Sequence, residues 1–276
     1  MHTTASDGGL SPAACVDEAA RAGLAAIGIT DHGTLAGNLE ALARGRTVGI
    51  EVVPGVEVSA THGRWAIHLL GYWPRADAPG LVALLERLRQ GREERNAQIL
   101  ERLAARGCTV SPEELAAEAP GEIVGRPHLA ALLVRKGHAA SFQAAFARLL
   151  ARGAAAYVPR WKPDAAAAIA ALRDAGAVPV LAHPGASGLR STDEAEALVT
   201  QLVTCGLRGL EVYYPAHDPG RTVAFERIAR QHGLVATGGT DFHGATKPDI
   251  RMGCGTGTLH VADPLLERLR EERERL

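Results

Sequence analysis

Short apolar runs that end in potential metal-binding side chains recur along the chain. Residues 26–29 are small or apolar and lead directly into Thr30, Asp31 and His32. Short runs of this kind with β-branched members are typical of buried strands. The same arrangement precedes or contains the following residues: Glu57, His68, His183, Asp241 and His243. The pattern predicts strands that each deliver a His, Asp or Glu at or near the carboxyl end.

Helical patterns alternate with most of these strands. Ser11-Pro12 is typical of a helix start, because the serine hydroxyl caps the helix and proline suits its first position. This helix should end at Gly23, and the others are expected near 34–44, 165–175, 193–205, 219–231 and 265–276. Alternating strands and helices indicate an α/β fold with a mostly parallel sheet. Closure into a barrel would gather the strand ends on one face.

A long helical stretch interrupts this alternation. Leu81, Leu84, Leu85 and Leu88 recur at helical spacing, and Ser111-Pro112 predicts another helix start. The segment 126–152 is also expected to be helical. We interpret 81–163 as a small helical insertion domain within a barrel formed by residues 1–80 and 164–276.

Composition excludes several classes of protein. Of the 276 residues, 30 are Lys or Arg and 31 are Asp or Glu, so a net charge of -1 provides no global attraction to nucleic acid or to anionic membranes. The four cysteines form no CxxC pair, which argues against a zinc ribbon or a disulfide framework. No signal peptide or membrane-spanning run is expected. We therefore predict a cytoplasmic protein without a membrane association or an obligate protein partner.

The candidate ligands form a set with consistent chemistry. Imidazole nitrogen and carboxylate oxygen bind Mn, Fe and Zn, and sites with several metals need bridging carboxylates. We therefore expect two to three divalent ions, without preference among these metals. The remaining histidines are expected to be non-ligands, except that His217 is equally consistent with a proton donor to the leaving group and with a loop residue. The predicted metal ligands are His2, Asp7, His32, Glu57, His68, His183, Asp241 and His243.

Six motifs together resemble the PHP (polymerase and histidinol phosphatase) phosphoesterases, in the expected order and over nearly the whole chain. They are His2-Thr3-Thr4-Ala5-Ser6-Asp7-Gly8, Thr30-Asp31-His32, Pro54-Gly55-Val56-Glu57, His68-Leu69-Leu70-Gly71-Tyr72, Ala182-His183-Pro184 and Gly239-Thr240-Asp241-Phe242-His243.

The resemblance implies a distorted (β/α)7 barrel and phosphoester hydrolysis by a metal-bridging hydroxide. It assigns one metal to Asp7, His32 and His243, and a second to Glu57, His68 and His183. Glu57 would bridge to a third metal, also held by His2 and Asp241. Asp241 and His243 are expected to be catalytic.

One feature departs from the family pattern. Family members open with a strand and a His-x-His pair, of which only the second histidine is present here, as His2. We expect that the start was assigned too late, at an internal methionine, so that the first strand is missing. Without that strand, the metal shared by Glu57, His2 and Asp241 should bind weakly.

The helical insertion narrows the resemblance to a subgroup that includes nucleoside 3′,5′-bisphosphate phosphatases and a 5′-to-3′ exonuclease acting on short RNA. Segments 125–128 and 157–160 resemble its phosphate-contacting segments, which predicts substrate contacts from Arg126, His128 and Arg160. Arginine suits phosphate because its fork donates two hydrogen bonds, although solvated helix or loop positions are the alternative. For Arg89, Arg92 and Arg95 we expect a salt-bridged outer face rather than the mouth of the site.

The leading hypothesis is removal of the 3′-phosphate from a nucleoside 3′,5′-bisphosphate. The first alternative is 5′-to-3′ exoribonuclease activity on short oligonucleotides with the same site. A catalytically silent PHP-type binding module is an alternative of another class. A hydrolase of C–N or C–O bonds is a third possibility, because related barrels host many chemistries.

Overall fold

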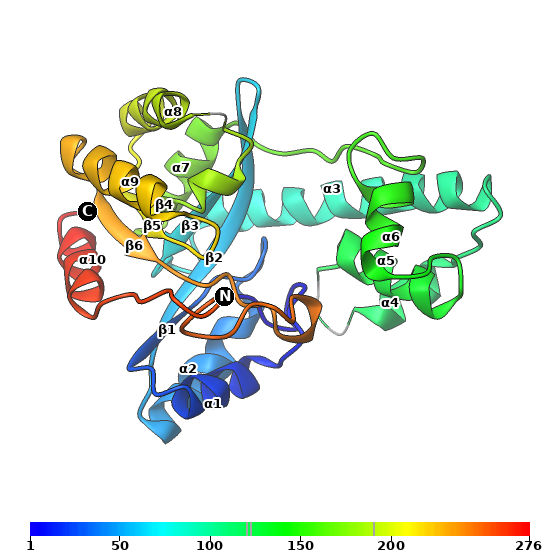
Figure 1. Cartoon of the computed structure of the whole chain (residues 1–276), viewed down its shortest axis with the longest axis horizontal. Coiled ribbons are helices and arrows are strands. Elements are labelled where there is room, and N and C mark those ends of the chain that lie inside the picture. Colours follow the sequence, from blue (N-terminus) through cyan, green and yellow to red (C-terminus); the bar gives the residue numbers. More distant parts are fainter. Residues whose placement is uncertain (120, 122, 190) are drawn as a thin grey trace.

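Six strands form one curled sheet in the computed structural model, which describes residues 1–119, 121, 123–189 and 191–276 (Figure 1). The strand order follows the sequence from β1 to β6. The sheet is a half-barrel rather than the complete (β/α)7 barrel that the resemblance implies. Its strands are β1 (Ala26–Ile29), β2 (Glu51–His62), β3 (Trp65–Tyr72), β4 (Val178–Leu181), β5 (Gly209–Tyr213) and β6 (Val235–Gly238).

Strand direction corrects the prediction of a mostly parallel sheet. β1 with β2, β4 with β5 and β5 with β6 are parallel, whereas β3 is antiparallel to both β2 and β4. Only Gly63 and Arg64 separate β2 from β3, and so short a connection can form only an antiparallel hairpin. Consequently Glu57 and His68 lie within long strands, not at carboxyl ends.

Helices cover the sheet where the sequence predicted them. α1 and α2 contact β1, α7 contacts β2 to β4, α9 contacts β5 and β6, and α10 contacts β4 and β6. The side chains of Ser11, Asp164, Ser191 and Asp218 accept hydrogen bonds at four helix starts. The bounds are α1 (Pro12–Arg21), α2 (Ala36–Val48), α7 (Ala165–Asp174), α8 (Thr192–Thr204), α9 (Pro219–Gln231) and α10 (Pro264–Glu274).

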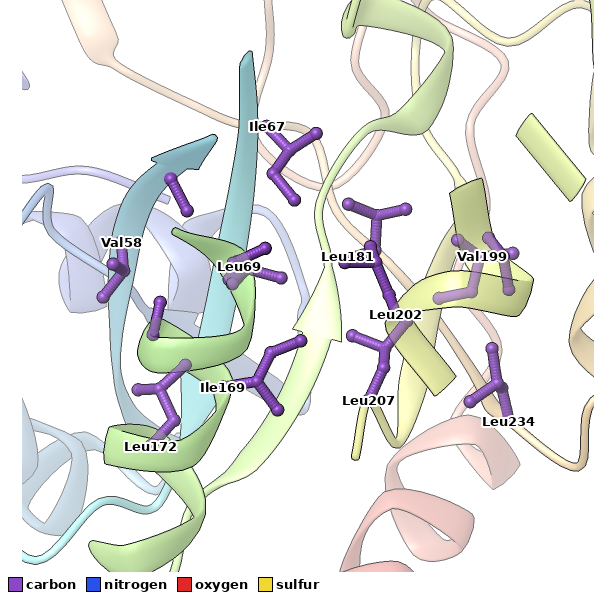
Figure 2. Packing of buried hydrophobic residues seen from close by; sticks show 14 of the residues in the cluster. Val58, Ile67, Leu69, Ile169, Leu172, Leu181, Val199, Leu202, Leu207 and Leu234 are labelled. Carbon is purple, nitrogen blue, oxygen red and sulfur yellow. The ribbon is translucent and has the colours of Figure 1, made fainter. Parts of the chain in front are cut away.

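The largest core lies between the sheet and α7 to α9 (Figure 2). Val58 of β2 and Leu69 of β3 are fully buried and lie near Ile169 and Leu172 of α7, and the equally buried Leu181 of β4 lies near Leu202 of α8. Burying such side chains contributes roughly 1.5–3 kcal/mol each. This apolar packing fixes the strands that carry the site residues.

A separate group of helices projects from the half-barrel. The 26-residue helix α3 runs from the sheet toward α4 to α6 (Figure 1). These helices enclose their own apolar cluster, which includes Ile99, Leu103, Leu129 and Leu133. The elements are α3 (Pro79–Ala104), α4 (Pro112–Glu118), α5 (Arg126–Arg135), α6 (Phe142–Ala145) and the π-helical turn η1 (Phe146–Leu150).

The half-barrel is open between β1 and β6, the two ends of the strand order. Met1 lies beside the outer edge of β1: its ammonium group donates to Gly28 O at 3.1 Å, and its carbonyl accepts from Thr30 N at 3.0 Å. These two bonds place Met1 opposite Ile29 in parallel register. Below Met1, a cavity of about 530 Å³ is lined by residues of both strands, among them Ile27 and Gly238.

None of the helices in the described parts of the chain has both the length and the apolar character needed to cross a bilayer.

Candidate metal centre

Glu57 is the central carboxylate of the site. It is 2% exposed, and its Oε2 lies 3.0 Å from His2 Nε2 and 3.8 Å from His32 Nδ1. Its Oε1 lies 3.3 Å from His183 Nε2 and contacts His68 Nδ1 more closely. One buried carboxylate therefore touches four imidazoles from four segments, the arrangement expected of a bridging ligand.

Electrostatics couple these groups strongly. Although burial opposes its charged form, the neighbouring His32 and His68 hold the pKa of Glu57 well below its usual range. Burial also opposes a charged His2, yet hydrogen bonds to Asp241 and Glu57 raise the pKa of His2 to about 10. Burial lowers the pKa values of His32 and His68. Burial thus favours the neutral form of His32 and His68, and neutral imidazole together with ionised carboxylate is the form that binds divalent metal ions.

Two further carboxylates approach from the chain's ends. Asp241 Oδ1 lies 3.0 Å from His2 Nε2, and Asp241 Oδ2 pairs with Lys247 Nζ at 2.7 Å. Asp7 Oδ1 lies 3.6 Å from His243 Nε2. His243 is 5% exposed, and burial together with the charge on His2 lowers its pKa to about 4.

The donor set fits divalent metal ions. Ligand atoms lie within 4.8 Å of one another in three groups: His2, Asp7, His32 with His243; His32, Glu57 with His68; and His2, Glu57 with Asp241. Three buried imidazole nitrogens of the candidate ligands have no hydrogen-bond partner among the described residues, namely Nδ1 of His2, of His32 and of His183. The third group is one of the three sets that the resemblance implies, and the first contains another such set with His2 added. The second has His32 in the place expected for His183, which contacts Glu57 but is not part of any of the three groups.

The backbone is forced into unusual conformations at two of these residues. His183 has a φ of 29° and Asp241 a φ of 51°, both rare for residues other than glycine. Strain of this kind persists where surrounding contacts fix it. One such contact is the hydrogen bond from His183 N to Glu211 Oε2, at 2.7 Å. Burial raises the pKa of Glu211 to about 7. Sequence analysis missed this residue, which lies in the middle of β5.

Asp31 anchors the amino-terminal loop. Its carboxylate accepts hydrogen bonds from Thr3 N, Thr3 Oγ1 and Ser6 Oγ at 2.6–2.7 Å. The loop then turns so tightly that only glycine fits at position 8, since a Cβ there would lie 2.2 Å from the carbonyl oxygen of His2. This packing holds His2 and Asp7 against the strand that carries Glu57.

A cationic pocket adjoins the histidine cluster. Its volume is about 240 Å³, and Asp7, His32 and His68 line one side. Asp7 is the only carboxylate among the described residues that line it. Five cationic side chains line the remainder: Arg92, Arg95, Arg126, Arg160 and Lys162. We call this space the cationic pocket.

The positions of Arg92 and Arg95 correct the expectation of a salt-bridged outer face. Arg89 does pair with Glu86 and Glu93 on the outside of α3. Arg95, by contrast, is 4% exposed. Its Nε and one terminal nitrogen find no hydrogen-bond partner among the described residues, and neither does Nε of Arg92. Burial and neighbouring cations lower the pKa of Arg92 to about 10 and that of Arg95 to about 9. Both remain charged at neutral pH, and neither forms an ion pair with a carboxylate in the part of the chain that the structure describes.

Two of the three predicted substrate contacts line the same pocket. Arg126 donates to Leu150 O at 2.9 Å, and its guanidinium lies 5.9 and 5.7 Å from the ring centres of Phe146 and Tyr157. Arg160 donates to Ser59 Oγ at 2.5 Å. His128 is placed differently: its Nδ1 accepts from Gly125 N at 3.0 Å and so caps the start of α5.

His217 is held by both ring nitrogens. Its Nδ1 lies 2.8 Å from Val212 O and therefore donates, while its Nε2 accepts from Gly185 N at 3.1 Å. Burial lowers its pKa. This arrangement favours the loop-residue alternative, in which the histidine fixes the turn after His183.

The curled sheet, the histidine and carboxylate cluster and the adjoining cationic pocket together define a metal-dependent phosphoesterase fold. The chain belongs to the PHP family, because the family model described as "PHP domain" matches residues 1–150. The resemblance inferred from the six sequence motifs is thereby confirmed.

Similar proteins span most of the chain. The chain is 33% identical over 246 residues to a 3′,5′-nucleoside bisphosphate phosphatase of Chromobacterium violaceum, covering 88% of this chain and 85% of that protein. It is 34% identical to the 5′-3′ exoribonuclease Rnm of Escherichia coli, covering 88% and 83% respectively. A solved structure of a candidate metal-dependent phosphoesterase from Bifidobacterium adolescentis has a TM-score of 0.88 and 28% identity, covering 98% of this chain and 94% of its own.

Proposed function

We propose that the protein removes the 3′-phosphate from nucleoside 3′,5′-bisphosphates, giving a nucleoside 5′-monophosphate and phosphate. The observation that carries the proposal is the cationic pocket beside the metal-ligand cluster. The cluster suits one phosphate group. The five cations of the pocket, whose described lining includes one carboxylate, Asp7, suit a second phosphate. The activity of the Chromobacterium violaceum relative supports the same substrate.

The proposed roles follow from position. Arg92, Arg95 and Arg160 would bind the 5′-phosphate and orient the nucleotide, so that its 3′-phosphate meets the cluster. Bound divalent ions would lower the pKa of water and neutralise phosphate oxygens. Asp241 holds Lys247 beside the cluster, where its ammonium group would limit repulsion of the incoming phosphate. The eight predicted ligands are proposed to hold two to three ions, of Mn, Fe or Zn.

The helical segment 81–163 is proposed to be an insertion domain that supplies the second phosphate site. Arg92 and Arg95 come from α3, Arg126 begins α5, and Arg160 and Lys162 follow the last helical turn. Removing this segment would leave the ligand cluster but no cationic pocket. A cytoplasmic location is also part of the proposal, supported by four cysteines that form no disulfide.

The proposal is tested by phosphate release in the presence of Mn²⁺. We expect kcat/KM for adenosine 3′,5′-bisphosphate to exceed that for adenosine 3′-monophosphate at least roughly tenfold, because the monophosphate lacks the group that the arginines bind. Equal values would contradict the role of the pocket. No release from either compound by protein shown to hold metal would favour a silent module or a hydrolase of C–N or C–O bonds.

A further inference from the structure

The cationic pocket holds more positive charge than a single 5′-phosphate requires. In the binding described above, Arg92, Arg95 and Arg160 hold that phosphate. Arg126 and Lys162 line the same pocket but are not among the groups that hold it. A terminal phosphate carries about −1.5 to −2 charges at neutral pH, which three guanidinium groups already balance. Two cations therefore remain for which a 5′-monophosphate offers no partner.

The pocket has an inner end near the ligand cluster and an outer end farther from it. Asp7 and Glu57 offset part of the burial that lowers the pKa values of Arg92 and Arg160, so these two guanidinium groups lie close to the cluster. At Lys162, burial lowers the pKa and the neighbouring cations lower it further, Arg160 most strongly. Lys162 therefore lies among cations, at the outer end.

Arg126 belongs to the outer end as well, because its charge also lowers the pKa of Lys162. One terminal nitrogen of Arg126 donates to Leu150 O at 2.9 Å, and its guanidinium lies beside the rings of Phe146 and Tyr157. These contacts fix the guanidinium but occupy only one of its several N–H groups. Within the described chain, neither Arg126 nor Lys162 is paired with a carboxylate. The outer end thus presents two cations that suit an anion.

The pocket is also larger than one phosphate needs. Its volume of about 240 Å³ equals that of roughly eight water molecules in the liquid. Beyond O5′, a 5′-monophosphate adds one phosphorus and three oxygen atoms, whereas a 5′-diphosphate adds two phosphorus and six oxygen atoms. A second phosphoryl group therefore finds both space and cations in this pocket.

We propose that the outer end of the cationic pocket binds a second 5′-phosphoryl group, so that nucleoside 3′-phosphate 5′-diphosphates are substrates and are preferred to 3′,5′-bisphosphates. This inference rests on the proposed function. Arg126 and Lys162 would contact the second phosphoryl group, while the 3′-phosphate meets the ligand cluster. Water adds its oxygen to the 3′-phosphorus, the P–O3′ bond breaks, and O3′ takes up a proton from that water. The products are a nucleoside 5′-diphosphate and phosphate, and the phosphoanhydride bond stays intact.

Lys162 is the residue to change, because Arg126 also begins helix α5 and its loss risks the fold. Lys162→Met keeps an unbranched apolar side chain but removes the ammonium group. Arg148→Met is the matched control. It removes an exposed cation of the adjoining turn η1 that is not among the described residues lining the pocket.

The experiment compares kcat/KM for 3′-phosphoadenosine 5′-diphosphate and for adenosine 3′,5′-bisphosphate at a fixed concentration of free Mn²⁺, and identifies the nucleotide product by chromatography. We expect the wild-type protein to prefer the diphosphate roughly fivefold or more, because hydrogen bonds between charged groups are the strong ones. The product of the diphosphate should be adenosine 5′-diphosphate. Lys162→Met should reduce the preference to less than about twofold, whereas Arg148→Met should retain it.

Each other result overturns the inference. An equal or lower kcat/KM for the diphosphate, or a preference that survives in Lys162→Met, overturns the second phosphate site and leaves the proposed function in place. Formation of adenosine 3′,5′-bisphosphate from the diphosphate would show that the 5′ end enters the ligand cluster instead. Loss of the preference in Arg148→Met would assign it to the net charge of the helical segment. Turnover of neither compound by metal-loaded protein overturns the proposed function and this inference with it.

Discussion

The pattern of apolar runs in the sequence located most residues of the candidate site but not all of them. All eight predicted ligands converge, because the runs that precede them form adjacent strands and the loop from 1 to 8 folds onto Asp31. Arg95 was misjudged because helical periodicity shows which residues share a face, not which face a neighbouring segment covers. Glu211 escaped notice because it ends no apolar run, and only its contact with His183 N gives it a role.

Arg95 offers the sharpest test of substrate binding by one side chain. Its buried guanidinium lines the cationic pocket, and two of its nitrogens have no hydrogen-bond partner within residues 1–119, 121, 123–189 and 191–276. A hydrogen bond between charged groups contributes about 1.5–3 kcal/mol, so Arg95→Ala should raise KM for a 3′,5′-bisphosphate roughly 10- to 100-fold. KM for the 3′-monophosphate should change little.

Arg89→Ala is the matched control for that measurement. Arg89 lies on the same helix but pairs with Glu86 and Glu93 at the surface. We expect the KM of Arg89→Ala for a 3′,5′-bisphosphate to stay within about twofold of the wild-type value, since exposed ion pairs contribute little to stability or binding. Equal effects of the two substitutions would show that net charge, not the pocket, governs binding.

The titration of Lys162 should weaken substrate binding at alkaline pH. Burial and the charges of Arg160, Arg126 and Arg92 lower its pKa to about 8. The ammonium form, which attracts phosphate, therefore prevails below pH 8 and is lost above it. Because kcat/KM reports groups of the free enzyme, it should fall as the pH rises through about 8, whereas kcat should fall later because bound phosphate retains the proton.

Lys162→Arg separates this cause from others. An arginine stays charged over the whole range, so the alkaline fall in kcat/KM should disappear. Persistence of the same fall in the variant would assign it to another group.

At the scale of elements, the order of helices and strands was predictable, and their directions were not. Capping residues such as Ser11 and Asp164 mark helix starts in the sequence itself. No helix lies between β2 and β3, and their short connection can join only antiparallel strands. The length of this connection therefore determines the direction of β3, although strands and helices alternate along most of the chain. Glu57 and His68 still meet, because an antiparallel hairpin brings the middles of its strands together.

The outer edge of β1 should accept an added strand, and such a strand should stabilise the fold. Met1 already pairs with β1 in parallel register, above a cavity that reaches β6. Adding five alternating apolar residues before Met1 should continue this pairing. Each new backbone hydrogen bond contributes about 1 kcal/mol, so two bonds should raise Tm by about 4–8 °C in a domain of this size.

A Gly-Ser extension of equal length is the control for that experiment. It offers the same hydrogen-bonding groups without side chains for the cavity, and we expect little change in Tm. An apolar extension that leaves Tm unchanged and is removed by protease would show that this edge accepts no strand.

At the scale of the whole molecule, the half-barrel and the helical segment each carry a different part of the candidate site. The sheet carries the histidine and carboxylate cluster, and the helical segment carries most of the cations that face it. The sequence indicated a helical stretch here, because alternation ceases at α3 and resumes at α7, and its status as a separate insertion domain stays a prediction. Which surfaces of the two parts meet depends on tertiary packing and could not be derived from local patterns.

The most direct test is phosphate release from adenosine 3′,5′-bisphosphate by chelator-treated protein, measured as Mn²⁺ is added back alongside the bound metal. The expected result is no activity after chelation, recovery in proportion to bound Mn²⁺, and no recovery in Asp241→Ala despite an intact fold. Turnover that survives removal of the metal, or bound Mn²⁺ without phosphate release, would contradict a metal-dependent phosphatase built on this cluster.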